Sequence, residues 1–318
     1  MFVFWIIFAL LVIAGLLAAL TVYCYRATFY VPKAKPSDPE AYPLPLGPVY
    51  EPYHGQMIQW MQQARSLPKQ IFSIRSHDGL MLYATYYECA PNAPLEIMFH
   101  GYRGSAERDL CGGVQRAFAL GHNALVVNQR GAPPSQGHVI SFGVNERKDC
   151  RSWVDFAIHQ FGKDVRIILT GISMGAATVL LAAGEELPEN VVGVLADCGY
   201  SRGEDIIKAV IRKRNLPPRL AYPFVKLAAK TLGHFDLDEA DVAAAASRCK
   251  VPVIFFHGEA DGYVPCYMSK INYDACNSHK KLVIIPEADH GLAYMVDPQG
   301  YLQAAREFFG PILHPETE

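Results

Sequence analysis

From residue 70 onward, short runs of β-branched and other apolar residues alternate with amphipathic stretches, and this alternation restricts the fold more than any other feature. Two runs, Gln70–Ser76 and Met81–Cys89, flank the turn signal His77-Asp78-Gly79 and predict an edge hairpin. Apolar strands separated by helices are typical of a parallel sheet covered by helices on both faces. Six such strands are expected after the hairpin: Leu95–Phe99, Ala124–Asn128, Arg166–Thr170, Val191–Ala196, Val251–Phe256 and Lys281–Ile285.

Helical patterns fill the intervals between these strands, and one interval is unusually long. Between Ala196 and Val251 the chain is longer than a simple crossover requires, so we expect an inserted helical cap at about 200–248. From Gly203 to Lys230 the cap carries seven basic and two acidic residues. This charge fits either a solvated helix face or a surface that touches anionic lipid or an acidic substrate. The other helices are expected at Glu107–Leu120, Glu146–Phe161, Ala176–Glu186, Tyr267–Ala275 and Gly300–Phe309.

The segment from Phe2 to Tyr25 is apolar and carries no charge. As a helix it would reach roughly 36 Å, more than the ~30 Å hydrocarbon core of a bilayer. No basic residue precedes this run and no small-x-small site follows it, which favours a retained single-pass anchor over residues 1–26 rather than a signal peptide. Arg26, Lys33 and Lys35 follow the span, and by the positive-inside rule this modest bias places the remaining chain in the cytoplasm.

Residues 27–52 are rich in proline, which excludes a long helix or a central strand. We expect an extended spacer that holds the domain of residues 53–318 away from the membrane. On this interpretation the domain folds and stays active without residues 1–50.

Composition excludes several functional classes. The chain has 29 basic and 31 acidic residues, so no overall positive charge indicates a nucleic-acid partner. Neither a Walker A motif nor a dinucleotide-binding glycine pattern is present, and no bound cofactor is expected. No H-E-x-x-H or C-x-x-C motif occurs, so no metal site is expected either, and the cysteines are interpreted as scattered thiols.

The strongest local motif is Gly171-Ile172-Ser173-Met174-Gly175, which lies between a predicted strand and a predicted helix. In this setting G-x-S-x-G forms a nucleophile elbow that exposes the serine hydroxyl at the C-terminal edge of the sheet. Ser173 is therefore the candidate nucleophile.

A serine nucleophile needs a histidine base and a carboxylate that orients the base. His290 follows the last predicted strand, and Asp261 follows the strand before it, which is the chain order expected for this arrangement. Asp197, at the end of an earlier strand, remains an alternative acid, and Glu259 and Asp289 lie nearby in the sequence.

The oxyanion that forms during acyl transfer needs two backbone N–H donors. Met174 directly follows the nucleophile, and Tyr102 lies in the glycine-containing loop after the strand that ends at Phe99. These two N–H groups are the expected donors. His100, in the same loop, is expected to bond the loop backbone rather than to take part in catalysis.

Taken together, these motifs resemble α/β-hydrolase-fold serine hydrolases. The resemblance is carried by His100-Gly101, the elbow, the segment from His257 to Pro265 and Asp289-His290-Gly291. Asn128-Gln129-Arg130-Gly131 and Ser141-Phe142-Gly143 are similar to segments of bacterial membrane-anchored α/β-hydrolases of unassigned substrate, although many of these have Asp where this chain has Asn128. The resemblance implies an α/β fold with about eight strands in a mostly parallel sheet, helices on both faces and a small cap.

The resemblance also implies hydrolysis of a small-molecule ester or acyl substrate through an acyl-enzyme. Peptidase, thioesterase and acyltransferase activities on the same fold remain open, because fold alone does not separate them. A non-catalytic binding module is a further alternative, although such a module would have no need for all three triad residues.

Overall fold

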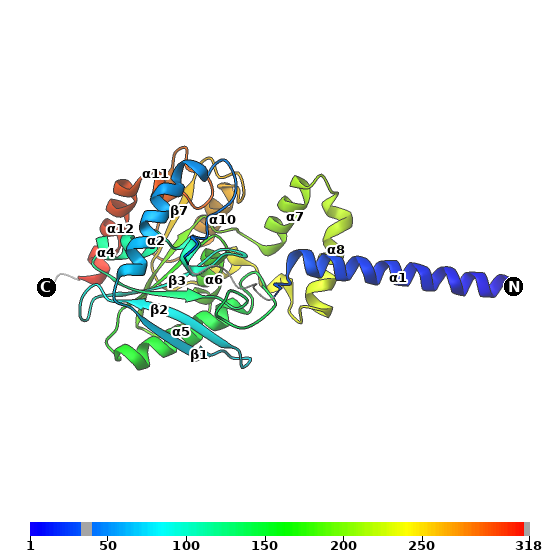
Figure 1. Ribbon diagram of the computed structural model, residues 1–318, viewed down its shortest axis with the longest axis horizontal. Coiled ribbons are helices and arrows are strands. Elements are labelled where there is room, and N and C mark those ends of the chain that lie inside the picture. The colour runs from blue at the N-terminus through cyan, green and yellow to red at the C-terminus, as the bar shows by residue number, and fades with distance from the viewer. Residues whose placement is uncertain (33–39, 315–318) are drawn as a thin grey trace.

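The computed structural model describes residues 1–32 and 40–314, which form a single eight-stranded sheet surrounded by helices, with one long helix projecting from it (Figure 1). The strand order is β1-β2-β4-β3-β5-β6-β7-β8. β2 is antiparallel to both of its neighbours, and all other pairs are parallel. The strands are β1 (Gln70–Arg75), β2 (Met81–Tyr87), β3 (Leu95–Phe99), β4 (Asn123–Asn128), β5 (Ile167–Ile172), β6 (Val191–Asp197), β7 (Val253–Gly258) and β8 (Lys280–Ile285). The predicted edge hairpin and six further strands are thus confirmed.

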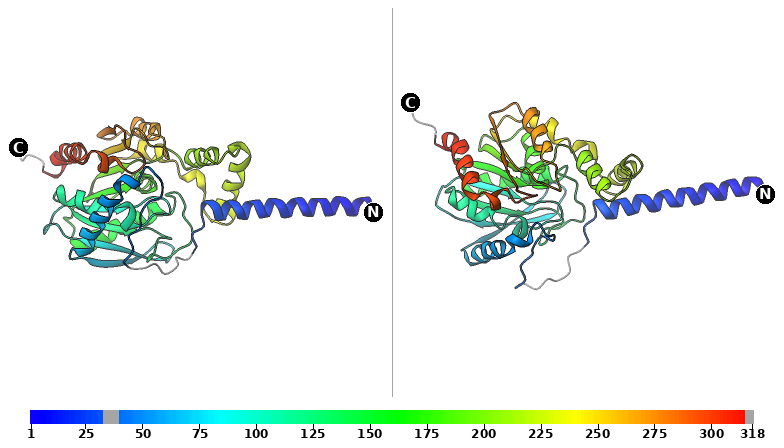
Figure 2. Two further views of the ribbon diagram at one scale, coloured as in Figure 1. Left: turned by 45° about the horizontal axis from the view of Figure 1, so that its top comes forward. Right: turned by 90° about the horizontal axis from the view of Figure 1, so that it is seen from above.

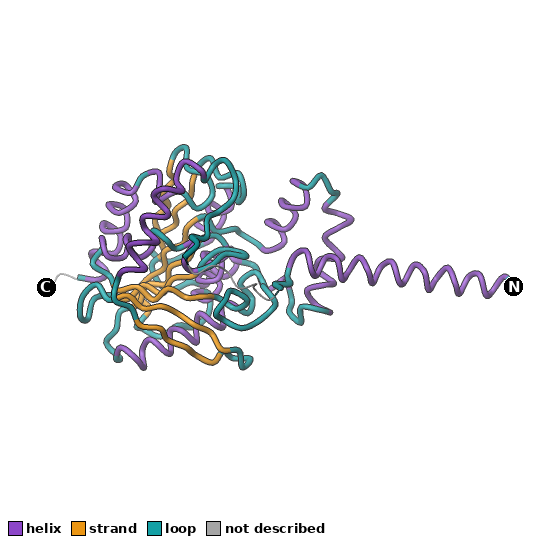
Figure 3. Tube along the Cα trace, in the orientation of Figure 1, coloured by secondary structure: helices purple, strands orange, loops and turns teal. Residues whose placement is uncertain are grey.

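Two helical layers cover this sheet (Figures 2 and 3). One layer contains α5, α6, α9 and α10, and the other contains α4, α11 and α12, with α2 and α3 packed beside α4. The helices are α1 (Phe2–Thr28), α2 (His54–Ser66), α3 (Ala106–Asp109), α4 (Gly113–Ala119), α5 (Glu146–Phe161), α6 (Met174–Ala183), α7 (Gly203–Lys213), α8 (Pro218–Thr231), α9 (Val242–Arg248), α10 (Tyr267–Ala275), α11 (Ala293–Val296) and α12 (Pro298–Leu313). Two 3₁₀ turns, η1 (Glu51–Tyr53) and η2 (Leu237–Glu239), complete the elements.

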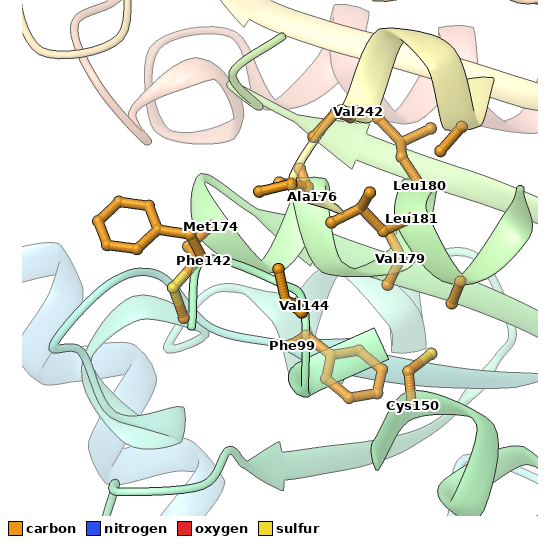
Figure 4. Packing of buried hydrophobic residues seen from close by; sticks show 14 of the residues in the cluster. Phe99, Phe142, Val144, Cys150, Met174, Ala176, Val179, Leu180, Leu181 and Val242 are labelled. Atoms are coloured by element: carbon orange, nitrogen blue, oxygen red, sulfur yellow. The ribbon is translucent and has the colours of Figure 1, made fainter. Parts of the chain in front are cut away.

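The core lies on both faces of the sheet because alternate side chains of each strand point in opposite directions. On β3, for example, Ile97 and Phe99 join the cluster beneath α5 and α6, whereas Met98 joins the cluster beneath α4. Every residue of α6 is buried, and its small and aliphatic side chains pack between Phe99 of β3 and Val242 of α9 (Figure 4). Burying each larger aliphatic side chain contributes roughly 1.5–3 kcal/mol, which makes α6 a rigid support for the residue that precedes it.

Parallel register brings the loops after β5, β7 and β8 to one edge of the sheet. Ile172 of β5 pairs with Asp197 of β6, and Asp197 pairs with Phe256 of β7. Gly258, the last residue of β7, pairs with Ile285 at the end of β8. The residues that follow these strands therefore converge at the C-terminal edge, where ligands bind in open α/β sheets.

The segment between β6 and β7 contains the predicted cap, but its four elements have two different positions. α7 and α8 pack on each other and stand away from the sheet (Figures 1 and 2). In contrast, α9 packs on α6 and α10 and belongs to the helical layer. The part that stands apart is therefore shorter than the expected range of 200–248.

The structure differs from the helical predictions in two places. The expected helix Glu107–Leu120 is two short helices, α3 and α4, because residues 110–112 form a turn between them. This turn packs closely on α2, since a Cβ on Gly112 would lie 2.6 Å from the Trp60 ring. Helix α2, which carries Trp60, was not predicted.

The N-terminal helix α1 is long and apolar enough to cross a membrane, a criterion that a signal sequence also meets. Its residues are exposed as far as Leu20, whereas Thr21 and Cys24 are buried. Directly after the helix, Phe29 is completely buried in the main core and contacts Phe142 and Phe235 with its ring. The end of α1 is therefore part of the folded domain and packs on α8.

The expected spacer also differs from the structure. Lys33, Lys35, Pro36 and Pro39 lie outside the described residues. The described part does not extend away from the domain: Val31 donates a backbone hydrogen bond to His138 across 2.9 Å. Tyr42, Leu44, Tyr50 and Tyr53 pack in a cluster with Met57 and Met61 of α2. The aromatic and apolar residues between the prolines thus hold this segment against the domain.

Candidate active site

Ser173 occupies a sharp turn between β5 and α6. Its φ angle is 56°, in a region that residues other than glycine rarely adopt. The flanking glycines are required by space, because a Cβ on Gly171 would lie 2.2 Å from the carbonyl of Gly175, and one on Gly175 would lie 2.0 Å from the Phe99 carbonyl oxygen. The turn is therefore packed tightly against β3, with the Ser173 side chain at the C-terminal edge of the sheet.

Hydrogen bonds join Ser173 to His290 and His290 to Asp261. The Ser173 hydroxyl lies 2.9 Å from His290 Nε2, and Asp261 Oδ2 lies 2.7 Å from His290 Nδ1. Ser173 follows β5, Asp261 follows β7 and His290 follows β8. The structure thus brings together the three side chains that the sequence predicts as nucleophile, acid and base.

Asp261 is held as an ionised acceptor. Its Oδ1 accepts backbone hydrogen bonds from Tyr263 at 2.8 Å and from Val264 at 2.7 Å. Its Oδ2 lies 3.2 Å from Nε2 of the buried His257. Burial alone would raise the pKa of Asp261, but hydrogen bonds from His257 and His290 hold it well below its usual range. Such a fixed carboxylate suits the stabilisation of an imidazolium.

The alternative acids have other environments. Asp197 is buried and accepts a hydrogen bond from the Tyr301 hydroxyl across 3.0 Å, and burial raises its pKa. Asp289 accepts hydrogen bonds from the backbone N–H groups of Gly262 at 2.9 Å and His290 at 2.6 Å, which ties the two loops together. Glu259 is exposed. Among the four acids considered, all within the described chain, Asp261 alone bonds the His290 ring.

The two expected oxyanion donors lie beside Ser173. Met174 is the first residue of α6, and Tyr102 lines the same cavities as Ser173. Within the described chain neither N–H donates to a protein acceptor, so both remain available to a ligand. A Cβ on the neighbouring Gly101 would lie 3.4 Å from the Ser173 Cβ, which shows how closely this loop approaches the serine.

The loop that contains Tyr102 is fixed from two sides. The Gly101 N–H donates to Asp109 Oδ2 across 2.9 Å. The His100 ring lies 2.9 Å from the Gly101 carbonyl oxygen and accepts a hydrogen bond from the backbone of Gln129 at 3.1 Å. His100 therefore bonds backbone groups, as expected from the sequence.

Three residues that support the site were not singled out from the sequence. His257 contacts Asp261, Asp109 holds the Gly101 backbone, and the Tyr50 hydroxyl donates to the His290 carbonyl oxygen across 3.2 Å. His257 could have been found, because it lies four residues before Asp261 in the same motif. Tyr50 and Asp109 carry no local signal, since their contacts depend on how distant segments pack.

Two cavities meet at Ser173. One has a volume of about 380 Å³ and is lined in part by Trp60, Asp197 and Tyr294. The other has a volume of about 530 Å³ and extends between α1, α7 and α8. Both are lined by Ser173, Tyr102 and Tyr263, and their walls otherwise differ almost completely. Volumes of this size are typical of small-molecule sites.

Two groups of side chains have the ligand types and spacing for a metal ion. In the first, Cys198 joins Asp261 and His290. In this group Asp261 Oδ2 already bonds His290 Nδ1 across 2.7 Å, and Asp261 Oδ1 accepts backbone hydrogen bonds from Tyr263 and Val264. The second group is His77, Asp78 and Asp149, in which both carboxylates already pair with Arg130. Neither group provides a site free of competing protein contacts.

No protein-family model matches the sequence. Its relatives include the uncharacterised protein YqkD of Bacillus subtilis, which is 26% identical over 190 residues, or 59% of this chain and 62% of that protein. The uncharacterised protein YfhR of Escherichia coli K12 is 25% identical over 202 residues, or 61% of this chain and 63% of that protein. The chain thus spans somewhat less than two thirds of the length of these curated relatives.

Solved structures with a similar fold include two esterases. Esterase Pf2001 of Pyrococcus furiosus matches with a TM-score of 0.64 and 20% identity, over 84% of this chain and 96% of that chain. Est1E of Butyrivibrio proteoclasticus, solved with ferulic acid bound, matches with a TM-score of 0.58 and 21% identity, over 76% and 99%. The chain therefore has an α/β-hydrolase fold.

Proposed function

We propose that this protein is a serine hydrolase that cleaves carboxylic esters through an acyl-enzyme intermediate. The observation that carries the proposal is the hydrogen-bonded series Asp261–His290–Ser173 at the junction of two cavities. The esterases among the structural neighbours support a small-molecule substrate.

In this mechanism, His290 Nε2 accepts the Ser173 proton as Oγ attacks the ester carbonyl carbon. Asp261 stabilises the resulting imidazolium, and the N–H groups of Tyr102 and Met174 stabilise the oxyanion. His290 then gives its proton to the departing alcohol, and the acyl-enzyme remains. His290 then takes a proton from a water molecule as the water oxygen attacks the acyl carbonyl carbon, and it returns this proton to Ser173 Oγ as the Oγ–acyl bond breaks. This step releases the carboxylic acid and restores the free serine hydroxyl.

We further propose that α1 is a retained single-pass anchor. The burial of Thr21, Cys24 and Phe29 against the domain supports retention, because removal of the segment would expose core surface. Arg26, after the apolar part of the helix, supports a cytoplasmic position for the domain by the positive-inside rule. Protease added to intact cells should leave a cytoplasmic domain uncut. Rapid cleavage of the domain by this protease would contradict the proposed cytoplasmic position.

The enzymatic proposal is tested by the kinetics of the full-length protein on p-nitrophenyl esters, with p-nitroanilides and thioesters measured in parallel. Ser173→Ala should lower kcat about 10³-fold or more, because binding and oxyanion stabilisation alone remain. Ser152→Ala on the outer surface of α5 is the matched control and should retain wild-type activity. Equal activity of Ser173→Ala and wild type would contradict the proposal, and faster turnover of anilides or thioesters would change the substrate class.

A further inference from the structure

We propose that the larger cavity binds the acyl chain of a lipid-like ester and that this ester enters from the bilayer crossed by α1. The inference rests on the proposed esterase function and names its substrate class. It is carried by three independent features: the composition of the cavity, its position along α1, and the surface around its edge.

The walls of the larger cavity suit a hydrocarbon chain. They come mostly from apolar side chains of α1, α7 and α8, such as Ala27, Ile207 and Ala221, and the cavity reaches Ser173. The charged residues among the described lining residues are Arg103 and Arg214, and both are exposed. Transfer of each methylene group from water into such a site contributes roughly 0.8 kcal/mol, so affinity should rise with acyl length.

The cavity begins where α1 would leave the membrane. The exposed part of α1, Phe2 to Leu20, spans roughly 28 Å at about 1.5 Å per residue, close to the ~30 Å hydrocarbon core of a bilayer. Leu20 is also the first residue of α1 that lines the cavity, followed by Tyr23, Cys24 and Ala27. A bilayer that surrounds this part of α1 would therefore end at the edge of the cavity. At that level α1 packs on α8 (Figure 1).

The stretch from Arg212 to Leu220, which contains the end of α7, the turn after it and the start of α8, has the composition of a membrane-contacting surface. Leu216 and Leu220 are 49% and 69% exposed, and both also line the cavity. Four exposed cations accompany them without an acidic residue in the same stretch: Arg212, Lys213, Arg214 and Arg219. Exposed leucines among basic residues fit the headgroup region of a bilayer that contains anionic lipid. On this proposal, the basic residues of the cap hold the cavity entrance at the membrane surface.

The smaller cavity would bind the alcohol portion of the ester. With the carbonyl carbon at Ser173 and the acyl chain in the larger cavity, the alcohol portion would occupy the cavity lined by Trp60 and Asp197. Attack of Ser173 on the carbonyl carbon releases this alcohol with a proton from His290. Water then releases the long-chain carboxylic acid from Ser173, so the products are one alcohol and one fatty acid.

The test uses the full-length protein in phosphatidylcholine vesicles, with and without phosphatidylglycerol, and measures the ratio of kcat/KM for p-nitrophenyl palmitate to that for p-nitrophenyl butyrate. Ala27→Trp and Ala221→Trp introduce the same bulky side chain into the cavity from two different helices, α1 and α8. If one variant does not fold, the other still tests the cavity. Ala18→Trp, on the exposed part of α1, is the matched control. Labelling of Ser173 by a small fluorophosphonate confirms that each variant is folded.

We expect both cavity variants to lower the palmitate-to-butyrate ratio at least about tenfold, equivalent to about 1.4 kcal/mol, and Ala18→Trp to leave the ratio unchanged. An unchanged ratio in folded cavity variants would overturn the inference while leaving the esterase function intact. Hydrolysis of palmitate from detergent micelles but not from vesicles would overturn entry from the bilayer. Hydrolysis of neither ester by the wild type would instead contradict the proposed function and, with it, the inference.

Discussion

The Tyr102 hydroxyl donates a hydrogen bond to the Thr28 carbonyl oxygen across 2.6 Å. This bond joins the loop beside Ser173 to the last turn of α1, where helix carbonyl groups lack partners within the helix. Arg103 strengthens the junction through Nη2, which donates to the carbonyls of Arg26 and Ala27 at 3.2 Å each. The position of the proposed oxyanion donor is therefore coupled to the docking of α1.

Tyr102→Phe should lower kcat on a short ester about 3- to 10-fold with little change in KM. The substitution keeps the ring and the backbone N–H but removes a hydrogen bond that contributes about 0.5–1.5 kcal/mol, so the N–H is held less firmly. Tyr263→Phe is the matched control, because its hydroxyl makes no hydrogen bond within the described chain although its ring lines the same cavities. Equal effects of the two substitutions would argue against the coupling.

Removal of residues 1–50 should destabilise the domain, contrary to the expectation from sequence alone. This truncation removes Phe29, which is completely buried, and loss of a buried aromatic ring costs about 3–5 kcal/mol. It also removes Tyr50, which bonds the His290 backbone. A truncation of residues 2–19 keeps both contacts and should unfold at a higher temperature. Thermal unfolding of both proteins in detergent tests this, and equal stability would show that Phe29 is not part of the core.

Asp261→Asn should reduce kcat by up to ~10⁴-fold with the fold preserved, because the amide favours the wrong imidazole tautomer. Asp197→Asn should cost far less, since Asp197 bonds Tyr301 rather than His290. The measurement is kcat for both variants on one chromogenic ester, with circular dichroism to confirm folding. A larger loss in Asp197→Asn would assign the acid to the end of β6.

Above about pH 4, the fall of kcat/KM with decreasing pH should show the protonation of a single group. The pKa of Asp261 is lowered in the folded protein, so this carboxylate stays ionised throughout that range. Its contribution to stability is present above the unfolded pKa of about 3.9 and is lost as the pH falls through the lower folded pKa. The free energy of unfolding of wild type should accordingly fall more steeply below pH 4 than that of Asp261→Asn. A two-proton limb above pH 4 would contradict this assignment.

The sequence predicts the sheet and the triad well because both depend on local patterns. β3 matches its expected bounds, and the G-x-S-x-G turn leaves little conformational choice around Ser173. The same holds for Asp261 and His290, since parallel strands place their following loops at one edge.

What the sequence does not reveal depends on packing between distant segments. Helix α2 has a weakly amphipathic sequence and follows a proline-rich stretch. The spacing of its apolar residues therefore does not predict a helix. The docking of α1 depends on Phe29 inserting between Phe142 and Phe235, which are distant in sequence. From sequence alone, an apolar helix followed by a short aromatic segment is compatible with an anchor detached from the domain and with a helix docked on it. Only the three-dimensional contacts distinguish these two arrangements.

The most direct test of the central claim is covalent labelling of the full-length protein with a fluorophosphonate, followed by identification of the modified peptide by mass spectrometry. We predict one adduct, on Ser173, whose formation is slowed in His290→Ala and abolished in Ser173→Ala. Labelling of a different residue, or undiminished labelling of Ser173→Ala, would contradict the assignment of Ser173 as the nucleophile.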